Sequence, residues 1–260
     1  MIVAERALVE AIESTLFIYP AVPGLLQELG IPGLRGRITK ISHPLANLCG
    51  DARFSEHEAD ALVEKVRQRY GDHAFGWVTG PSTRPADLPK SLETAGLAHA
   101  DSIAGLALTD LDAPIPVNPQ AQVREITWQD AIARSEMMAR AYGLPTEVMR
   151  LFNEMLAAMS PRIKARAYIA DLGDDSPAAW SYLVYLPDSP TVLLGGAGTL
   201  EEHRGKGLYT ALVARRVADA RADGRTAAII QADRRTSAPI AAKLGFHELC
   251  GLEFFASSGG

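Results

Sequence analysis

Residues 204–209 of this chain, Arg-Gly-Lys-Gly-Leu-Tyr, place two basic residues and two glycines directly between a predicted strand and a predicted helix. The first backbone N–H groups of a helix have no acceptor within the helix, and the helix dipole favours negative charge at that end. Glycines let the backbone approach an anion closely, and Arg204 and Lys206 add positive charge. The segment therefore predicts a cradle for a phosphate or pyrophosphate group. A surface turn with two solvated cations is the alternative, because short glycine motifs recur by chance.

The segment matches neither of two common phosphate-binding motifs. The sequence contains no G-x-x-x-x-G-K-[ST], which excludes a Walker A loop. No G-x-G-x-x-G follows the first strand, so the usual dinucleotide fingerprint is absent as well. The predicted cradle must be of another kind.

Composition limits the classes of protein that remain. The 260 residues, 47% of them hydrophobic, suffice for one large core or two smaller ones. The formal net charge of -5 argues against nucleic acid as the main partner, because such a partner requires a basic surface. Cys49 and Cys250 are too few and too far apart for a disulfide framework or a zinc site, and the histidines lack metal-site spacing. Two buried thiols in a reducing cytosol are the favoured interpretation, with no metal bound.

No segment of the sequence predicts a membrane partner. Residues 1–17 form a predicted amphipathic helix without the apolar core of a signal peptide. No stretch approaches about 18 uninterrupted apolar residues, the length that spans a bilayer. We therefore expect a soluble, cytoplasmic protein.

A proline-rich segment divides the chain. Residues 111–122 contain three prolines and few large apolar side chains, which indicates an extended linker. We therefore expect two domains, residues 1–118 and 119–260.

The pattern of elements in both halves is mixed α/β. In the first half, Ser55 and Glu58 form a capping-box signature ahead of a helical apolar stripe that reaches Tyr70. The other elements expected there are a strand at 74–80, a helix at 86–96 and a strand at 103–111. The second half predicts strands at 122–126, 165–172, 179–186, 191–200, 226–232 and 247–255, with helices at 127–142, 146–159, 208–224 and 237–245.

The chain resembles the GNAT superfamily of N-acetyltransferases. Residues 204–209 match the acetyl-CoA loop of that family, Arg/Gln-x-x-Gly-x-Gly/Ala, and residues 241–249, AAKLGFHEL, resemble its closing helix and Leu-Gly-Phe turn. The order of elements over 122–255 agrees with the family fold. Residues 76–97 resemble the amino-terminal half of two-domain members, in which a degenerate acetyltransferase domain precedes the active one. Consistent with this, residues 1–118 contain no Arg-x-x-Gly-x-Gly loop.

The resemblance implies a fold and a cosubstrate. The fold is two acetyltransferase-like domains, each a mixed, mostly antiparallel sheet flanked by helices. Backbone N–H groups of 204–209 would bind the pyrophosphate of acetyl-CoA, and strand 197–199 would pair with the pantetheine arm and polarise the thioester carbonyl. The implied cofactor-binding residues are Ala197, Gly198, Thr199, Arg204, Gly205, Lys206, Gly207, Leu208, Tyr209, Arg234 and Ser237.

The sequence departs from the family pattern at two positions. Tyr209 stands where the loop ends in Gly or Ala, so its side chain must turn away from the phosphates, donate a hydroxyl to them, or pack on the neighbouring strand. Ala241 stands where many members have a tyrosine that acts as general acid. Catalysis is still allowed, because coenzyme A thiolate is a tolerable leaving group that water can protonate.

Other polar residues give no catalytic assignment. His203 adjoins the cradle, although an exposed loop histidine is the commoner case. Tyr168, Tyr182 and Tyr185 lie on predicted strands, where packing is the default, and alternation sends the last two to opposite faces. The glutamates at 201–202 are interpreted as solvated charges. The general base and general acid stay unassigned.

We therefore expect a GNAT-type N-acetyltransferase that moves an acetyl group from acetyl-CoA to an amine by direct attack. The acceptor is a small-molecule or protein amine that enters beside helices 127–159, and the acidity of the chain favours a cationic one. The alternative is a non-catalytic acyl-CoA-binding or regulatory module, and an interaction scaffold ranks third. The acceptor, the acyl chain length, the role of the first domain and the oligomeric state, homo-oligomer included, stay open.

Overall fold

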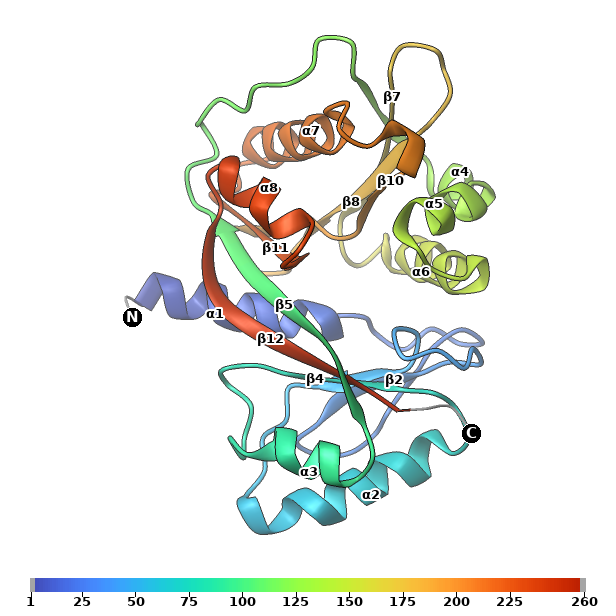
Figure 1. Cartoon of the computed structure of the whole chain (residues 1–260), viewed down its shortest axis with the longest axis vertical. Coiled ribbons are helices and arrows are strands. Elements are labelled where there is room, and N and C mark those ends of the chain that lie inside the picture. Colours follow the sequence, from blue (N-terminus) through green and yellow to red (C-terminus); the bar gives the residue numbers. More distant parts are fainter. Residues whose placement is uncertain (1–2, 258–260) are drawn as a thin grey trace. The chain divides into compact units, whose positions relative to one another are not determined.

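The computed structural model describes residues 3–257 and has an α/β fold with helices α1–α8 and strands β1–β12 (Figure 1). The chain groups into two compact units. The first unit comprises the described residues of Met1–Gly105, Ala232–Arg235 and Glu248–Gly260, and the second comprises Leu106–Gln231 and Thr236–His247. Strands β5 and β12 thus contribute residues to both units. The division at 118/119 expected from the linker stays a prediction of domain organisation.

The first unit is a mixed sheet with three helices. Its sheet has the order β1-β2-β3-β4-β12-β5, in which β3 and β4 are parallel and the pairs β1–β2, β2–β3 and β4–β12 are antiparallel. The helices are α1 (Val3–Ser14), α2 (Ala59–Tyr70) and α3 (Leu88–Thr94), and the strands are β1 (Gln27–Glu28), β2 (Arg35–Ile38), β3 (Leu48–Gly50), β4 (Gly76–Thr79), β5 (Ala98–Leu108) and β12 (His247–Ala256).

Helix α2 follows from its sequence pattern. The Ser55 N–H donates to Glu58 Oε2 at 3.0 Å, as the capping-box signature predicts. The apolar stripe from Ala59 to Tyr70 is buried in a cluster that includes Trp77 of β4. Strands β1, β2 and β3 were not predicted, because two to four residues are too short to show an alternating pattern.

A buried arginine ties the start of this unit together. Arg37 on β2 donates from Nε to the Ala46 carbonyl at 3.1 Å, from Nη1 to Leu16 at 2.9 Å and from Nη2 to Leu45 at 2.6 Å. Each guanidinium nitrogen thus has a carbonyl partner, which is what a buried cation requires. Burial lowers the pKa of Arg37 from its ordinary value.

The second unit contains the predicted cradle. Its strands follow the order β11-β9-β8-β7-β6, with β10 beside β8; β11 and β9 are parallel, and the pairs β8–β9, β7–β8, β6–β7 and β8–β10 are antiparallel. Its elements are β6 (Gln122–Ile126), α4 (Trp128–Ala133), α5 (Ser135–Tyr142), α6 (Thr146–Met159), β7 (Ala165–Asp171), β8 (Ala179–Tyr185), β9 (Thr191–Leu193), β10 (Ala197–Thr199), α7 (Leu208–Ala222), β11 (Ala227–Asp233) and α8 (Ser237–Lys243).

Helices cover both faces of the central strands of this unit. Trp180 and Tyr182 of β8 bond to the α5 and α6 side, through the Met138 carbonyl and Asn153. Tyr168 of β7 bonds to Asp219 of α7 on the opposite face. Figure 1 shows α4, α5 and α6 on one side of β8 and β10, and α7 on the other.

Two predicted elements of the second unit are wrong in detail. The helix expected over 127–142 is two helices, because Arg134 leaves helical geometry with φ -96° and ψ 12° between α4 and α5. The strand expected over 191–200 is interrupted between β9 and β10. Helix α6 spans the predicted residues 146–159.

Asn153 of α6 joins α4, α5 and β8 through a buried polar network. Its Nδ2 donates to the Ala131 carbonyl and to Ser135 Oγ, both at 3.0 Å, and its Oδ1 accepts from the Tyr182 hydroxyl. The side chain is fully buried, so its hydrogen bonds have no competition from solvent.

Replacing the Asn153 side chain should weaken the attachment of α4 and α5 to α6 and of α6 to β8. We expect Asn153→Ala to lower the free energy of unfolding by about 2–4 kcal/mol, because it strands buried donors and acceptors. Urea unfolding measures the loss. Gln129→Ala, at an exposed position of α4, is the control and should change stability by less than about 0.5 kcal/mol. Equal stability of the two variants would contradict the role given to Asn153.

Candidate functional site

The predicted cradle follows β9 and β10, and pairing with the neighbouring strand β11 ends between these two strands. Strand β9 pairs with β8 on one side and with β11 on the other, and the last bond to β11 runs from Leu194 N–H to the Ile229 carbonyl at 2.9 Å. The Tyr182 N–H then faces two carbonyls, Gly195 at 2.9 Å and Gly196 at 3.2 Å, which is the pattern of a β-bulge. Beyond it, β10 pairs only with β8 among the described strands.

The split leaves one edge of β10 open. Gly198 lies in register with Trp180, and the Leu200 N–H donates to the carbonyl of Ala178, the residue before β8, at 2.8 Å. Backbone groups alternate between the two edges of a strand, so those of Ala197 and Thr199 face away from β8. The Thr199 carbonyl accepts from Arg204 Nε at 3.3 Å. Within residues 3–257, no acceptor is recorded for the N–H groups of Ala197 and Thr199.

Glycine at 198 allows α5 to pack closely on β10. A Cβ atom at this position would lie 2.9 Å from the Ala141 carbonyl carbon and 2.9 Å from Trp180 Nε1. Both distances are shorter than real Cβ contacts, and the first involves backbone. Any side chain at 198 would therefore displace the open strand.

The loop ahead of α7 has the backbone geometry of an anion cradle. Gly205 and Gly207 have φ of 74° and 82°, which glycine adopts without strain. The first helical bond of α7 runs from the Ala211 N–H to the Gly207 carbonyl. The N–H groups of residues 205–210 have no recorded acceptor in the described part of the chain. The loop thus presents the N–H groups of residues 205–210 as a row of donors, whereas the Arg204 N–H, which was predicted to belong to the row, donates to the Glu201 carbonyl at 3.1 Å.

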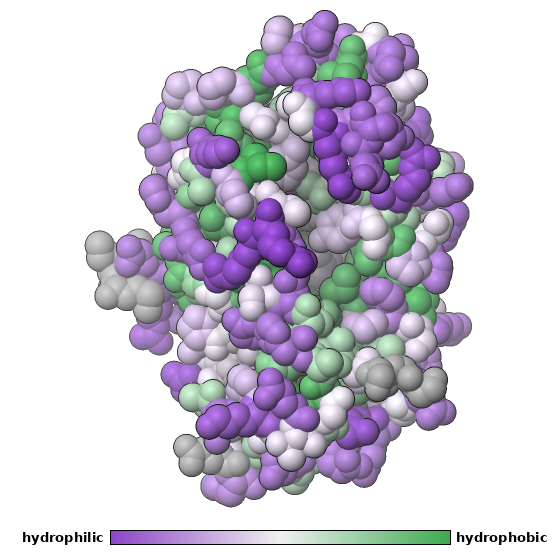
Figure 2. Space-filling view, in the orientation of Figure 1, coloured by the Kyte–Doolittle hydropathy of each residue, from purple (hydrophilic) through white to green (hydrophobic). Residues whose placement is uncertain are grey.

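The charges around the loop leave a positive excess. Arg204 and Lys206 are exposed, and no ion pair is recorded for either among the described residues. Exposed Glu202 pairs with Arg140 of α5 at 2.6 Å. A backbone hydrogen bond and the nearby Arg140 hold the pKa of Glu202 below its ordinary value. Figure 2 shows hydrophilic residues gathered over the region that Figure 1 assigns to α4 and the turn ahead of α7.

The linker contacts this loop, which the sequence did not predict. Asn118 Nδ2 donates to the Lys206 carbonyl at 2.9 Å. A Cβ at Gly207 would lie 3.1 Å from the Asn118 Cβ, so glycine also permits this close approach. The only sequence signal was the turn-forming residue type of Asn118.

Tyr209 and Ala241, the two departures from the family pattern, both lie in the second unit. The Tyr209 hydroxyl is buried and has no protein hydrogen-bond partner, and burial raises its pKa. Ala241 on α8 is 1% exposed, and its methyl side chain cannot act as a general acid. His203, expected to be exposed, is half-buried with an unpartnered Nδ1, because it lies in the 3-10 turn Glu201–His203 that folds against the sheet end at Leu200.

The remaining predicted cofactor residues lie after β11. Arg234 forms a double ion pair with Glu248, at 3.0 and 2.6 Å, within the first unit. Ser237 is half-buried and begins α8 in the second unit. A cofactor contact for either residue stays a prediction.

The strand tyrosines serve packing. Tyr168 and Tyr185 donate to Asp219 and Asp223 of the α7 side, whereas Tyr182 donates to Asn153 on the opposite face. The expected opposite orientation of Tyr182 and Tyr185 is confirmed. Burial, followed by the bond to a carboxylate, raises the pKa of Tyr168 and of Tyr185.

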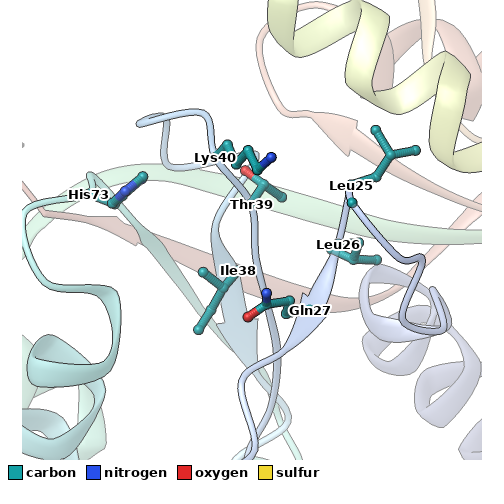
Figure 3. Close-up of a pocket in the computed structure, with 8 residues that line it drawn as sticks. Leu25, Leu26, Gln27, Ile38, Thr39, Lys40 and His73 are labelled. Carbon is teal, nitrogen blue, oxygen red and sulfur yellow. The ribbon is translucent and has the colours of Figure 1, made fainter.

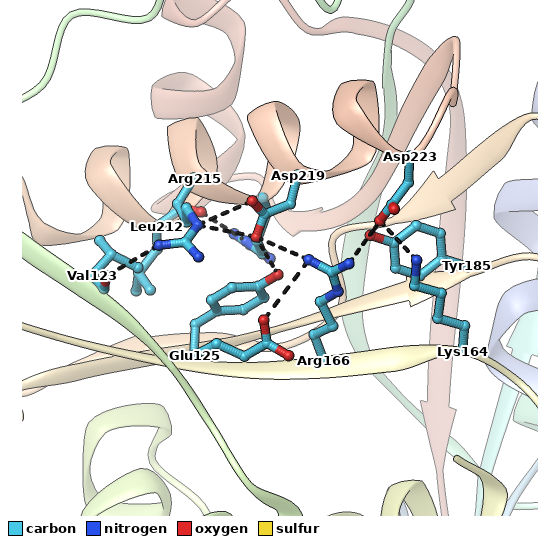
Figure 4. Close-up of polar contacts among 11 residues, drawn as sticks. Val123, Glu125, Lys164, Arg166, Tyr185, Leu212, Arg215, Asp219 and Asp223 are labelled. Atoms are coloured by element: carbon cyan, nitrogen blue, oxygen red, sulfur yellow. Dashed lines mark hydrogen bonds and ion pairs between the residues drawn. The ribbon is translucent and has the colours of Figure 1, made fainter. Parts of the chain in front are cut away.

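An ion-pair network anchors α7 beyond the loop (Figure 4). Arg166 of β7 pairs with Asp219 at 3.4 Å and with Asp223 at 2.8 Å. Lys164 also pairs with Asp223 at 2.8 Å, and Arg215 pairs with Asp219 at 3.0 Å. The network fixes the C-terminal half of the helix whose N-terminus forms the cradle.

A separate pocket lies in the first unit (Figure 3). Its volume is about 370 Å³, and it forms where Gln27 of β1 faces Ile38 of β2. Lys40 and His73 contribute its nitrogen-bearing side chains along with Gln27. None of the predicted cofactor residues lines it.

Cys49 and Cys250 are free and buried, as expected. No group of three or more metal-ligating side chains occurs among residues 3–257. Across that same range, none of the helices has the length and apolarity needed to cross a bilayer.

Comparisons with known proteins identify the fold. No protein-family model and no curated protein matches the sequence. The chain is similar to the solved structure of a GCN5-related N-acetyltransferase from Kribbella flavida, with 18% identity, TM-score 0.69 and coverage of 99% of this chain and 96% of that one. It is also similar to a tandem GNAT protein from the clavulanic acid biosynthesis pathway (16% identity, TM-score 0.60, 87% and 78% covered). A GCN5-related N-acetyltransferase from Sphaerobacter thermophilus gives 16% identity, TM-score 0.64 and coverage of 86% and 76%.

At these identities the likeness establishes the fold. The chain is an α/β protein with a mixed, mostly antiparallel sheet flanked by helices, as expected. More narrowly, it has the GNAT fold, which the resemblance of residues 204–209 and 241–249 had indicated.

The first prediction from the site concerns the open strand. We expect Gly198→Ala to lower the free energy of unfolding by about 1–3 kcal/mol, because its Cβ meets the backbone of α5. Gly195→Ala is the matched control, since its nearest contact would be the flexible end of Leu193 at 3.3 Å. Chemical unfolding of both variants measures the difference, and indistinguishable midpoints would rule out the close approach.

A second prediction concerns the α7 anchor. Hydrogen bonds from Lys164 and Tyr185 hold the pKa of Asp223 below its ordinary value. The Asp223 contribution to stability is therefore present at pH 7 and is lost as pH falls through the folded-state pKa. We expect Asp223→Asn to unfold at lower urea than wild type at pH 7, with the gap closing toward pH about 2–3. Asp72→Asn, at an exposed position, is the control, and a gap that persists in acid would contradict the assignment.

Proposed function

We propose that this protein is a GNAT-superfamily acyltransferase whose second unit binds acetyl-CoA and transfers the acetyl group to an amine. The observation that supports this most directly is the adjacency along the chain of two sets of unpaired backbone donors. One is the open edge of β10, which follows the point at Leu194 where pairing with β11 ends, and the other is the row of N–H groups at residues 205–210. A ligand with amide groups at one end and a pyrophosphate at the other suits both sets.

The cosubstrate would use these donors in order. The pyrophosphate would accept hydrogen bonds from the loop N–H groups, with Arg204 and Lys206 balancing its charge. The pantetheine amides would pair with the Ala197 and Thr199 edge of β10, as an added strand pairs with a sheet edge. Ser237, which begins α8 in the second unit, is a further proposed contact. The absence of side chains at Gly205 and Gly207 leaves room for the phosphates.

The chemistry would be direct attack by the acceptor. A neutral amine nitrogen forms a bond to the thioester carbonyl carbon, and the carbonyl electron pair moves to oxygen. A main-chain N–H on β10 stabilises that oxyanion. When the carbonyl reforms, the C–S bond breaks and the thiolate leaves with its electron pair. The amine loses its proton to water.

No side chain is needed as acid for the leaving group. Ala241 supplies none, and the strand tyrosines are bound to Asp219, Asp223 and Asn153. A thiol pKa of about 8.5 makes the thiolate stable enough to leave and to take a proton from water. We therefore propose that catalysis rests on positioning and oxyanion stabilisation.

The acceptor would approach from the side of α4, α5 and α6. It is a small-molecule or protein amine, and the net charge of -5 favours a cationic one. The first unit would be the degenerate domain of a tandem protein, since residues 1–118 contain no Arg-x-x-Gly-x-Gly loop. The free, buried cysteines fit a cytoplasmic enzyme.

The second candidate is a non-catalytic acyl-CoA-binding or regulatory module. The buried alanine at 241 favours it, because the usual acid is missing. The two candidates differ in one measurement, the release of free thiol from acetyl-CoA in the presence of a panel of amines. Thiol release supports the enzyme, and binding without release supports the module.

Ligand binding gives the first test. We expect acetyl-CoA and coenzyme A to raise the melting temperature, and ATP and NAD to leave it unchanged, because only the first two carry pantetheine. A ligand at 100 times its Kd adds about 2.7 kcal/mol of stability, which is readily measured.

A matched pair of variants locates the site. Gly205 has open space around a Cβ and a φ of 74°, a conformation that Asn and Asp tolerate better than other residues. We expect Gly205→Asp to weaken acetyl-CoA binding about tenfold or more through charge repulsion, and Gly205→Asn to bind far more tightly than the Asp variant. Equal binding by both would place the pyrophosphate elsewhere.

A further inference from the structure

Besides His203 Nδ1 in the turn ahead of the loop, three buried polar atoms among the described residues of the second unit have no hydrogen-bond partner in the protein. They are the Tyr209 hydroxyl, Arg216 Nη2 and Ser181 Oγ. Arg216 and Ser181 are 0% exposed. Tyr209 and Arg216 belong to α7, and Ser181 belongs to β8. None of the three atoms takes part in the ion-pair network that anchors the C-terminal half of α7.

The topology brings these atoms into one layer. Tyr209 and Arg216 are seven residues apart, which is close to two helical turns, so they share a face of α7. Arg216 Nη1 donates to the Tyr182 carbonyl at 3.0 Å, so this face lies against β8. Trp180 and Tyr182 point to the α5 and α6 side, and alternation therefore turns Ser181 toward α7.

Arg216 has an unusual set of partners for a buried cation. Its Nε donates to Leu212 and its Nη1 to Tyr182, and no carboxylate pairs with it among the described residues. Arg37, the buried arginine of the first unit, satisfies all three guanidinium nitrogens with carbonyls. Burial lowers the pKa of Arg216 to about 10, and the Tyr209 and Tyr168 hydroxyls oppose that shift.

Water is the partner that fits this set. A buried donor without a partner is costly, and native proteins meet such groups with internal water molecules that make two to four hydrogen bonds. Arg216 Nη2 can only donate, whereas the two hydroxyls either donate or accept. A water that accepts from Arg216 retains a second lone pair and two protons for Tyr209 and Ser181.

We propose that Tyr209, Arg216 and Ser181 hold an internal water molecule between α7 and β8, and that this water positions the first turn of α7. The second clause rests on the proposed function, because that turn is the proposed pyrophosphate cradle. The bulky residue at 209, in place of Gly or Ala, then has a use. It turns inward and fastens the cradle to the sheet, and it does not touch the phosphates.

The sign of a stability change tests the water. If the Tyr209 and Ser181 hydroxyls were unpartnered, Tyr209→Phe and Ser181→Ala would each raise the urea midpoint by removing a stranded polar group. A shared water predicts the reverse: each variant has a lower midpoint, and the double variant loses less than the sum of the two, since one water serves both hydroxyls. Tyr185→Phe, whose hydroxyl bonds Asp223 directly, is the control and should add independently to Ser181→Ala. Raised midpoints or full additivity would overturn the proposal.

A crystal structure of the free protein at high resolution gives the direct observation. Density for a water within hydrogen-bond distance of Tyr209 Oη, Arg216 Nη2 and Ser181 Oγ supports the proposal, and an empty space or a chloride at that place overturns it. Both experiments use the protein without coenzyme A, so their outcome is independent of the proposed function.

The positioning role has its own measurement. Where wild type binds acetyl-CoA, Tyr209→Phe should weaken binding by about two- to tenfold, the range given by one net hydrogen bond. Tyr185→Phe should bind as wild type does. Unchanged binding by Tyr209→Phe would leave the water in place but refute its effect on the cradle, whereas no binding by wild type would refute the proposed function alone.

Discussion

The bulge at Gly195 and Gly196 is the constraint on which the rest of the site depends. A strand that pairs with both neighbours has no free backbone groups, and β9 is such a strand. At the bulge the Tyr182 N–H faces two carbonyls, the last bond to β11 is made by the residue just before it, Leu194, and β10 continues on β8 alone among the described strands. The open edge exists because of that change, and the chain runs from it directly into the glycine loop. Loss of backbone pairing over the three residues of β10 thus creates the edge that we propose as the binding surface.

The loop itself is held from several directions. Asn118 fastens the Lys206 carbonyl, Arg140 neutralises Glu202, and the Arg166 network holds the far end of α7. These contacts involve side chains that a ligand does not need. Preorganised donors cost little to align when the ligand arrives, since their geometry is set during folding. The site therefore depends on the surrounding polar contacts as much as on the glycines.

Much of the fold and part of the site followed from the sequence. Helix α6 and the buried stripe of α2 were predicted because their apolar periodicity is long and regular. The turn at 204–209 between a strand and a helix was predicted from its glycines and its position, and its role as an anion cradle stays a prediction. The split of 191–200 was not, since Leu194-Gly195-Gly196 reads as a continuation of an apolar strand. The break at Arg134 and the short strands β1, β2 and β3 also lack a local signal. The inward orientation of the Tyr209 side chain depends on Arg216, two helical turns further along α7, and on β8. Neither contact has a local sequence signal.

The hydrogen bond between Asn118 and Lys206 limits where the protein can be divided into fragments at its proline-rich segment. Its composition suggests a spacer that can be cut without consequence. A fragment that began at residue 119 would lack the side chain that fastens the loop, although it would retain every glycine of the motif. Residues 106–118 also group with the second unit. The proline-rich composition predicts where the chain lacks helices and strands. It does not predict where the chain can be cut without loss of contacts to the loop.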